Sequence, residues 1–184
     1  MTLLSLALGD YGIYQVFVDG PGAALAAGDV APSIAAITDP QILAHASDRE
    51  IASLAAYARD GTHGFGAWLE GELAACCWYA EAGADSQRST WPIEPGEAKL
   101  LQITTASRFR GKGLARALVA QSAALMRRRG FGPLYARVWH SNAPSLAAFR
   151  AAGWVRRALV VELTPLGIGA PRRLVFGARR SQPG

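Results

Sequence analysis

Two closely spaced glycines, Gly111 and Gly113, separate an apolar segment from a long amphipathic one, and this arrangement leaves few choices of fold. The apolar segment Lys99–Thr105 predicts a buried strand, and the apolar repeat over Leu114–Arg129 predicts a helix. The glycines let the backbone turn tightly and approach a ligand without a Cβ in the way. Because a helix start offers unpaired N–H groups and the positive end of a dipole, this unit predicts an anion site suited to a pyrophosphate.

Positive charge surrounds this loop and is carried by Arg108, Arg110, Lys112 and Arg116. The glycine spacing differs from the phosphate loop of nucleoside triphosphatases. It also differs from the dinucleotide-binding pattern GxGxxG, because Arg116 stands where the third small residue belongs. The sequence therefore favours another diphosphate over a nucleoside triphosphate or a dinucleotide.

The remaining segments predict a mixed α/β fold in which helices flank a sheet. Glu70-Gly71-Glu72 is a tight-turn signal, so the segments on either side of it predict a β-hairpin. The hairpin strands are residues 64–69 and 73–80, and further strands are expected over residues 12–18, 134–139, 154–163 and 173–176. Expected helices span residues 51–58, capped by Ser47 or Asp48, and 143–152, capped by Ser141 or Asn142; residues 83–96 are expected to form a loop.

Length and composition predict a single globular domain over residues 1–184. The chain has 184 residues, 51% apolar and 18% charged, which is enough to bury a core. No apolar run reaches the ~18 residues of a membrane span, and the first ten residues lack the basic start of a secretory signal. Cys76 and Cys77 are adjacent, a spacing that builds neither a disulfide framework nor a metal site. We therefore expect a cytoplasmic protein with no membrane association and no bound metal.

The net charge of +5 conceals an asymmetry along the chain. Residues 1–98 carry three Arg and no Lys against thirteen acids, whereas residues 99–184 carry sixteen basic residues against a single acid, Glu162. The basic half suggests an anionic ligand such as a phosphate, a nucleic acid or a membrane surface. The alternative is arginine-rich codon usage, because only Lys99 and Lys112 are lysines.

The segment Arg110–Ala115, RGKGLA, resembles the R/Q-x-x-G-x-G/A signature of the GNAT acyltransferases, which bind acetyl-coenzyme A. A second block, with Asn142, Leu146, Phe149 and Gly153-Trp154, resembles the family's Asn…Leu…Tyr…Gly-Phe helix. The blocks are one helix and one strand apart, and the resemblance covers roughly residues 64–163. It implies a GNAT fold, a mostly antiparallel sheet that is splayed between its fourth and fifth strands and flanked by helices.

The resemblance implies acetyl-CoA as co-substrate and assigns residues to it. The backbone N–H groups of Arg110, Gly111, Lys112, Gly113, Leu114 and Ala115 would hold the pyrophosphate. The backbone of Ile103, Thr104 and Thr105 would pair with the pantetheine arm in the splay, and Asn142 would contact the arm there. Arg108, Lys112 and Arg116 would lie near the phosphates.

The resemblance leaves the catalytic groups open. Many GNAT members use a tyrosine as the acid for the departing thiolate, and here Phe149 stands at that position. Water or Ser145, one turn earlier, could substitute, or the thiolate could leave without an acid. Glu97 is the leading candidate base, because it lies 13 residues before Arg110, where histone-type members have a glutamate that acts through water. His140 is the second candidate, since an unperturbed imidazole titrates near ~6.5.

We expect the acceptor to bind against the acidic first half of the chain. Glu70, Glu72, Glu81 and Asp85 would favour a cationic amine, and Trp78, Tyr79 and Trp91 would line the site. The function predicted is transfer of acetyl from acetyl-CoA to a primary amine of a small molecule or peptide by direct attack, by a monomer or homodimer. Two alternatives stay open: a non-catalytic acyl-CoA-binding module, favoured by the missing tyrosine, and a nucleic-acid-binding protein. No nucleic-acid partner is expected, because no recognised module for one is present.

Overall fold

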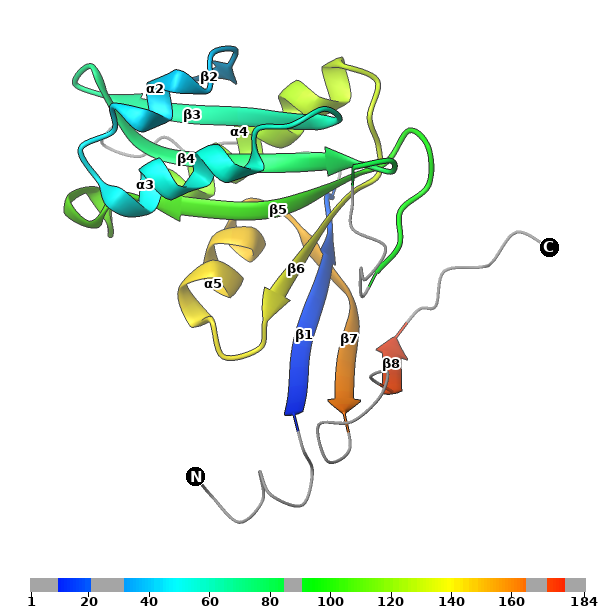
Figure 1. Cartoon of the computed structure of the whole chain (residues 1–184). Helices are drawn as coiled ribbons and strands as arrows, with labels where there is room; N and C mark the ends of the chain where they lie inside the picture. The colour runs from blue at the N-terminus through cyan, green and yellow to red at the C-terminus, as the bar shows by residue number, and fades with distance from the viewer. Residues whose placement is uncertain (1–9, 21–31, 85–90, 165–171, 178–184) are drawn as a thin grey trace.

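The computed structural model describes residues 10–20, 32–84, 91–164 and 172–177, which form one eight-stranded mixed sheet with helices on both faces (Figure 1). The strands are β1 (Asp10–Val18), β2 (Ser33–Ile37), β3 (Thr62–Leu69), β4 (Glu72–Glu81), β5 (Ala98–Thr105), β6 (Leu134–Trp139), β7 (Val155–Thr164) and β8 (Arg172–Gly177). The helices are α2 (Gln41–Ala44), α3 (Arg49–Ser53), α4 (Leu114–Arg128) and α5 (Ala143–Ala151), with short 3-10 turns η1 (Leu54–Tyr57) and η2 (Ser107–Phe109). Within the described ranges, no helix is both long enough and apolar enough to cross a bilayer.

The predicted mixed α/β fold is confirmed, with local differences. The expected helix over residues 51–58 is a short α-helix, α3, that continues as the 3-10 turn η1, and Asp48 is its cap. The strand β2 and the helix α2 lie in a stretch for which the sequence predicts no element. The expected loop over residues 83–96 lies partly outside the described residues.

The β3–β4 hairpin forms as the turn signal predicts. Glu70 and Gly71 have φ angles of 53° and 83°. Two consecutive residues with positive φ are the requirement of the type I′ turn, whose twist matches that of the strands it joins. The hairpin places the buried strand β4 in the middle of the first half of the sheet.

The sheet opens between β5 and β6, which is the expected splay. The strand order is β2-β3-β4-β5-β6-β1-β7-β8, and β5–β6 is its parallel pair. These two strands pair only over Ala98–Leu100, whereas β4 stays paired with β5 as far as Thr105. Leu101 is an extra residue in β5 opposite the Trp78/Tyr79 step, so a bulge begins where the strands separate. One edge of β5 beyond the bulge therefore faces the gap between the two halves of the sheet (Figure 1).

The first strand of the chain completes the second half of the sheet, because β1 lies between β6 and β7. Its Phe17 stacks on Phe149 of α5, with ring centroids 5.7 Å apart, and so holds α5 against this half. On the other half, α4 packs against β3 and β4 through residues such as Leu118 and Met126, which are fully buried. Each half of the sheet is thus covered by a helix, and the opening between the two halves is where a binding site can form.

Candidate active site

A cleft of about 820 Å³ lies where β5, the start of α4 and α5 meet, and we call it the glycine-loop cleft. Its lining includes most of the predicted cofactor residues: Ile103, Thr104, Thr105, Arg110, Gly111, Gly113, Leu114, Ala115, Arg116, Asn142, Ser145 and Phe149. Arg108 and Lys112 are the predicted cofactor residues that do not line it. The fold therefore brings both sequence blocks to one cleft beside the open edge of β5.

The loop glycines leave open space beside the helix start. Gly111 and Gly113 have φ angles of 79° and 74°, in the left-handed region that favours glycine, and Gly113 is the N-cap of α4. An added Cβ at either position would meet no atom within 4 Å. Because Gly113 provides no side-chain cap, the first N–H groups of α4 keep their capacity to bind an anion. This geometry fits a diphosphate.

The predicted cations around the loop have different partners. Arg110 lines the cleft, forms an ion pair with Glu50 at 2.5 Å and donates from Nε to the Thr105 carbonyl at 3.2 Å. Arg108 forms an ion pair with Glu72, and its guanidinium also bonds the Ser47 hydroxyl at 3.0 Å. The ammonium of Lys112 lies 5.3 Å from the Phe109 ring centroid. Arg116 lines the cleft directly.

These ion pairs also account for part of the charge asymmetry. Glu50 and Glu72 belong to the acidic first half of the chain, and Arg110 and Arg108 belong to the basic second half. The Nε of Arg127 likewise donates to Asp19 at 2.7 Å. Charge that is segregated along the sequence is therefore paired across the fold.

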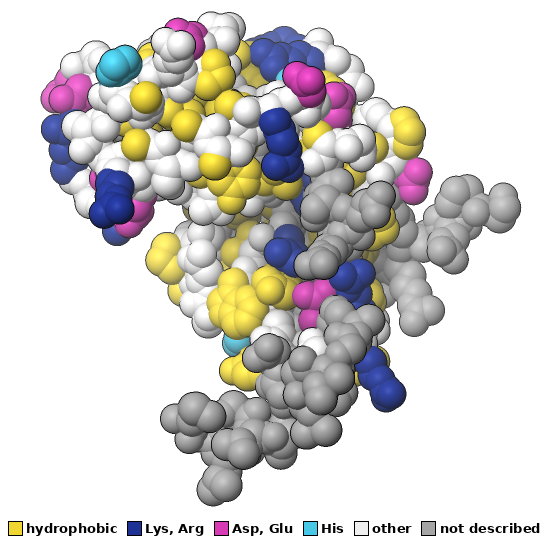
Figure 2. Space-filling view, in the orientation of Figure 1, with side chains coloured by type: hydrophobic (Ala, Val, Ile, Leu, Met, Phe, Trp, Pro, Cys, Tyr) yellow, Lys and Arg dark blue, Asp and Glu magenta, His cyan; other side chains and the backbone are white. Residues whose placement is uncertain are grey.

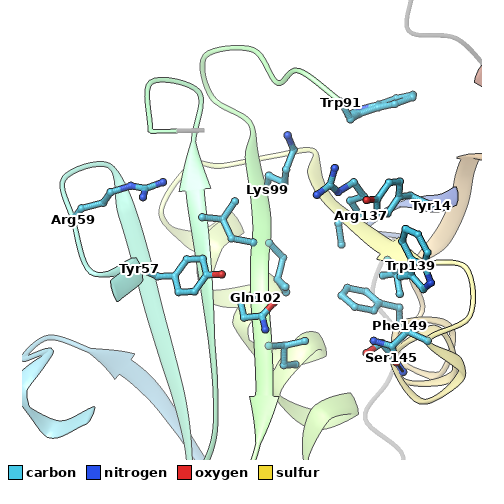
Figure 3. Close-up of a pocket in the computed structure, with 16 residues that line it drawn as sticks. Tyr14, Tyr57, Arg59, Trp91, Lys99, Gln102, Arg137, Trp139, Ser145 and Phe149 are labelled. Atoms are coloured by element: carbon cyan, nitrogen blue, oxygen red, sulfur yellow. Dashed lines mark hydrogen bonds between the residues drawn. The ribbon is translucent and has the colours of Figure 1, made fainter. Parts of the chain in front are cut away.

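A second cleft, of about 530 Å³, adjoins the first on the other side of the β5–β6 opening, and we call it the aromatic cleft (Figure 3). Tyr57 and Arg59 form one wall of this cleft. The strand β5, with Lys99 and Gln102, runs through the middle of the cleft. The other wall is formed by Tyr14, Trp91, Arg137 and Trp139. The two clefts share Gln102, Ile103, Asn142, Ser145 and Phe149. Figure 2 shows the surface narrowed and hollowed between the two halves, with hydrophobic and basic side chains in the hollow.

Known proteins with the same arrangement of strands and helices were found by comparison of sequence and structure. The model of the acetyltransferase (GNAT) family matches residues 33–154, which run from the first residue of β2 to the residue before β7. The chain belongs to the GNAT family. No protein of curated function matches it in sequence.

Solved structures share the GNAT fold at low sequence identity. A putative GNAT acetyltransferase from Novosphingobium aromaticivorans is 19% identical, with a TM-score of 0.58 over 94% of this chain and 67% of its own. The ribosomal-protein-S18-alanine N-acetyltransferase of Escherichia coli is 18% identical, with a TM-score of 0.51 over 76% of this chain and 97% of its own. AAC(6')-Ib in complex with paromomycin and acetyl-CoA is 16% identical, with a TM-score of 0.57 over 80% of this chain and 94% of its own. At these identities the likeness concerns the fold.

The two predicted bases of this GNAT chain lie outside both clefts. Glu97 is buried just before β5, and its carboxylate accepts a hydrogen bond from the Glu94 N–H at 2.8 Å. His140 is exposed after β6; its backbone N–H donates to the Ile13 carbonyl at 2.9 Å, and its Nδ1 lies 3.3 Å from the same oxygen.

Phe149, at the family's tyrosine position, lies where the two clefts meet. It is 2% exposed and packs against Phe17 and Trp154, whose ring centroid is 5.1 Å away. Ser145 is half-buried one turn earlier in α5 and lines both clefts. Its backbone N–H donates to the Asn142 Oδ1 at 3.2 Å, so Asn142 caps α5 as predicted.

The acidic residues expected to recognise the acceptor are not brought together in the aromatic cleft. Glu72 pairs with Arg108, Glu70 lies in the hairpin turn, and Glu81 lines a separate pocket beside Gly61. Asp85 lies outside the described residues. Trp91 does line the aromatic cleft, whereas Trp78 lines another pocket. Tyr79 is buried, and its hydroxyl oxygen lies 3.0 Å from that of Ser122. None of the acids expected to recognise the acceptor is among the described residues of the aromatic cleft.

The prediction also missed residues that the fold brings to the aromatic cleft: Tyr14, Tyr57, Arg59, Lys99, Gln102, Arg137 and Trp139. A signal for part of this set was present, because Arg137 and Trp139 are two residues apart in a predicted strand and so share one face. Among the described residues, no three His, Cys, Asp or Glu side chains gather closely enough to hold a metal ion.

Proposed function

We propose that this GNAT protein is an acyl-CoA-dependent N-acyltransferase that moves acetyl from acetyl-CoA to the primary amine of a small molecule or peptide. The observation that carries the proposal is the continuity of the two clefts along β5. A glycine loop suited to a diphosphate stands at one end, and a second cleft large enough for an acceptor opens at the other. Between them lies the open edge of β5 beyond Leu100.

The residues of the glycine-loop cleft fit acetyl-CoA. The space beside Gly111 and Gly113 accommodates the pyrophosphate against the first turn of α4, and Arg116 adds charge to it. Ile103–Thr105 would pair through their backbone with the pantetheine arm. Bound acetyl-CoA supplies an activated acyl group as a thioester.

The reaction then depends on the shared lining of the two clefts. The amine nitrogen forms a bond to the acyl carbon, the carbon–sulfur bond breaks, the amine gives up a proton and the departing thiolate gains one. Ser145 is the hydroxyl in the shared lining that this chain offers near that point. Glu97 remains our candidate for the base, and it would act through water. The role is tested by comparing the pH dependence of kcat/KM between the Glu97→Gln variant and the wild type.

The test is calorimetric titration with acetyl-CoA followed by thiol-release assays over a panel of amines and amino acids, with the acetylated product identified by mass. We expect saturable binding, and one acetylated amine for each thiol released. Thiol release that does not depend on an amine would count against the proposal.

The second candidate is a non-catalytic acyl-CoA-binding module. It is favoured by the absence of a proton donor at Phe149 and by the positions of Glu97 and His140 outside the clefts. Tight acetyl-CoA binding without transfer to any amine would select this function.

A further inference from the structure

The lining that the two clefts share is where, under the proposed function, an acyl group from the glycine-loop cleft meets an acceptor from the aromatic cleft. It consists of Gln102, Ile103, Asn142, Ser145 and Phe149. Ile103 and Phe149 are apolar, and the Oδ1 of Asn142 already accepts the Ser145 N–H at 3.2 Å as the cap of α5. The polar side chains of the described shared lining that take no part in a helix cap are therefore those of Gln102 and Ser145.

Gln102 belongs to β5 and stands at the start of its open edge. It pairs with Trp78 of β4 directly after the bulge at Leu101, and the pairing of β5 with β6 ends at Leu100. Gln102 is exposed, and no other described residue is a hydrogen-bond or ion-pair partner of its side chain. A strand that β4 holds in place thus carries an amide whose N–H and C=O groups are available to a ligand.

Figure 3 shows the position of this amide relative to the walls of the aromatic cleft. Gln102 stands on β5 in the middle of the cleft, with Tyr57 on one side and Ser145 and Phe149 on the other. A ligand that extends from one cleft into the other therefore passes the Gln102 side chain.

A carboxamide at this place has a restricted chemistry. It neither takes up nor gives up a proton near neutral pH, and it offers two N–H donors and one carbonyl acceptor. When an amine attacks a thioester, the electrons of the C=O bond move onto the acyl oxygen, and they return as the carbon–sulfur bond breaks. An N–H donor directed at that oxygen stabilises the transition state more than the ground state and so raises kcat.

The described shared lining offers no carboxylate or imidazole for proton transfer. Phe149 has no proton for the departing thiolate, and Glu97 and His140 lie outside both clefts. Donation of a hydrogen bond to the acyl oxygen is a contribution that Gln102 can make without any proton transfer.

We propose that Gln102 is a catalytic residue whose side-chain N–H group donates a hydrogen bond to the carbonyl oxygen of the acyl group of acetyl-CoA. This proposal rests on the acyltransferase function proposed above and adds the residue that stabilises the oxygen as it becomes negative. The hydrogen stays on the amide nitrogen throughout, while the amine loses a proton and the thiolate gains one as described above. In the opposite arrangement, the amide oxygen would accept a hydrogen bond from the acceptor amine, and the variants below distinguish the two.

Two substitutions at Gln102 separate donation from acceptance. Gln102→Met keeps the length of the side chain and removes both functions, whereas Gln102→Glu keeps an acceptor and removes the N–H donors. We expect Gln102→Met to lower kcat by about 10²-fold, the usual effect of removing one donor to a developing oxyanion, with little change in the KM for acetyl-CoA. Gln102→Glu should lower kcat at least as much, because its negative charge lies beside the oxygen that becomes negative.

The matched controls are Gln41→Met and Gln41→Glu, because Gln41 is an exposed glutamine that lines neither cleft. Both controls should keep the wild-type kcat. A Gln102→Glu protein with the wild-type kcat, or a Gln102→Met protein changed only in the KM for the amine, would overturn the proposal while leaving the acyltransferase function intact. Thermal unfolding and acetyl-CoA binding of each variant check that it is folded.

An infrared measurement tests the contact without turnover. Difference spectra between bound acetyl-CoA and its carbonyl-¹³C form isolate the stretching vibration of the thioester carbonyl. A hydrogen bond to the oxygen weakens the C=O bond, so we expect a lower frequency in the wild type and in Gln41→Met than in Gln102→Met. Equal frequencies in the wild type and Gln102→Met would overturn the proposal.

The infrared result also separates this proposal from the function on which it rests. A lower frequency in a wild-type protein that acetylates no amine would support the contact and count against the acyltransferase function. Failure of the wild type to bind acetyl-CoA would overturn both.

Discussion

One carboxylate, that of Asp48, joins the start of α3 to the turn that precedes the glycine loop through the N–H of Ser107. The Oδ2 of Asp48 accepts this N–H at 2.9 Å, and its Oδ1 accepts those of Glu50 and Ile51 at 2.9 and 3.3 Å. Asp48 is thus both the N-cap of α3 and the link between α3 and η2. The helix α3, whose Glu50 lines the glycine-loop cleft, and the turn that precedes the glycine loop are held together at this residue.

Two substitutions at Asp48 separate these roles. Asp48→Asn keeps one oxygen for capping and presents an NH₂ group to Ser107, whereas Asp48→Ala loses both contacts. We expect Asp48→Ala to lower the free energy of unfolding by ~1 kcal/mol or more, the usual effect of a lost N-cap. We expect Asp48→Asn to cost less stability but still to weaken acetyl-CoA binding, because the loop loses its link. Chemical unfolding and calorimetry measure the two effects, and unchanged binding in both variants would contradict the link.

The same contacts give a pH dependence. The hydrogen bond from the Ser107 N–H, followed by those from α3, lowers the pKa of Asp48 below its usual range. A carboxylate with a lowered folded-state pKa stabilises the fold above its unfolded pKa of ~3.9, and this contribution is lost as the pH falls towards the folded value. The difference in unfolding free energy between the wild type and Asp48→Asn should therefore shrink from about pH 6 to about pH 3. A difference that grows on acidification would refute this assignment.

The glycine loop was predictable because its signals are local. Positive φ at Gly111 and Gly113, the helical repeat that follows and the Asn142 cap each depend on a few consecutive residues. The aromatic cleft was not predictable in this way, because Tyr14 and Arg137 become neighbours only through the insertion of β1 beside β6. The ion pairs that neutralise part of the acidic half, such as Arg108 with Glu72, also depend on tertiary placement and could not be predicted from local sequence.

Short elements were missed for a physical reason as well. The strand β2 is five residues long and lies at the edge of the sheet, and its sequence SIAAI carries little alternation. The helix α2 has four residues and only Leu43 is buried in it. Both are stabilised by packing on the first half of the sheet rather than by their own sequence.

Phe149 gives a prediction about stability and turnover. Because the ring is 2% exposed between Phe17 and Trp154, Phe149→Ala should lower the free energy of unfolding by ~3–5 kcal/mol, whereas Val155→Ala, at a side chain 57% exposed, should change it by less than ~0.5 kcal/mol. Phe149→Tyr should raise turnover if thiolate departure limits the rate, within the ~10²–10⁴-fold range of general acid catalysis. A Phe149→Ala protein of wild-type stability and kinetics would place this residue outside both the core and the site.

The cations around the glycine loop should differ in their effect on acetyl-CoA. Arg116 lines the cleft, whereas Lys112 lies over the Phe109 ring and does not line it. We expect Arg116→Gln to raise the KM for acetyl-CoA by about tenfold, ~1.4 kcal/mol, with little change in kcat, because a phosphate contact acts equally on ground and transition states. Lys112→Gln should have a smaller effect. Steady-state kinetics measures the KM for acetyl-CoA in both variants. A larger rise in KM for Lys112→Gln than for Arg116→Gln would contradict the assignment of Arg116 to the phosphates.

The most direct test of the acyl-CoA site is a calorimetric titration of acetyl-CoA into Gly113→Val and Gly130→Val. Both glycines have positive φ, 74° and 90°, and open space where a Cβ would stand, so the two variants carry similar backbone strain. Gly113 lines the glycine-loop cleft, and Gly130 lies at the far end of α4, outside it. We predict that Gly113→Val stays folded and loses at least ~tenfold in affinity, whereas Gly130→Val binds like the wild type. Near-normal affinity in a folded Gly113→Val protein would contradict the assignment of the pyrophosphate to this loop.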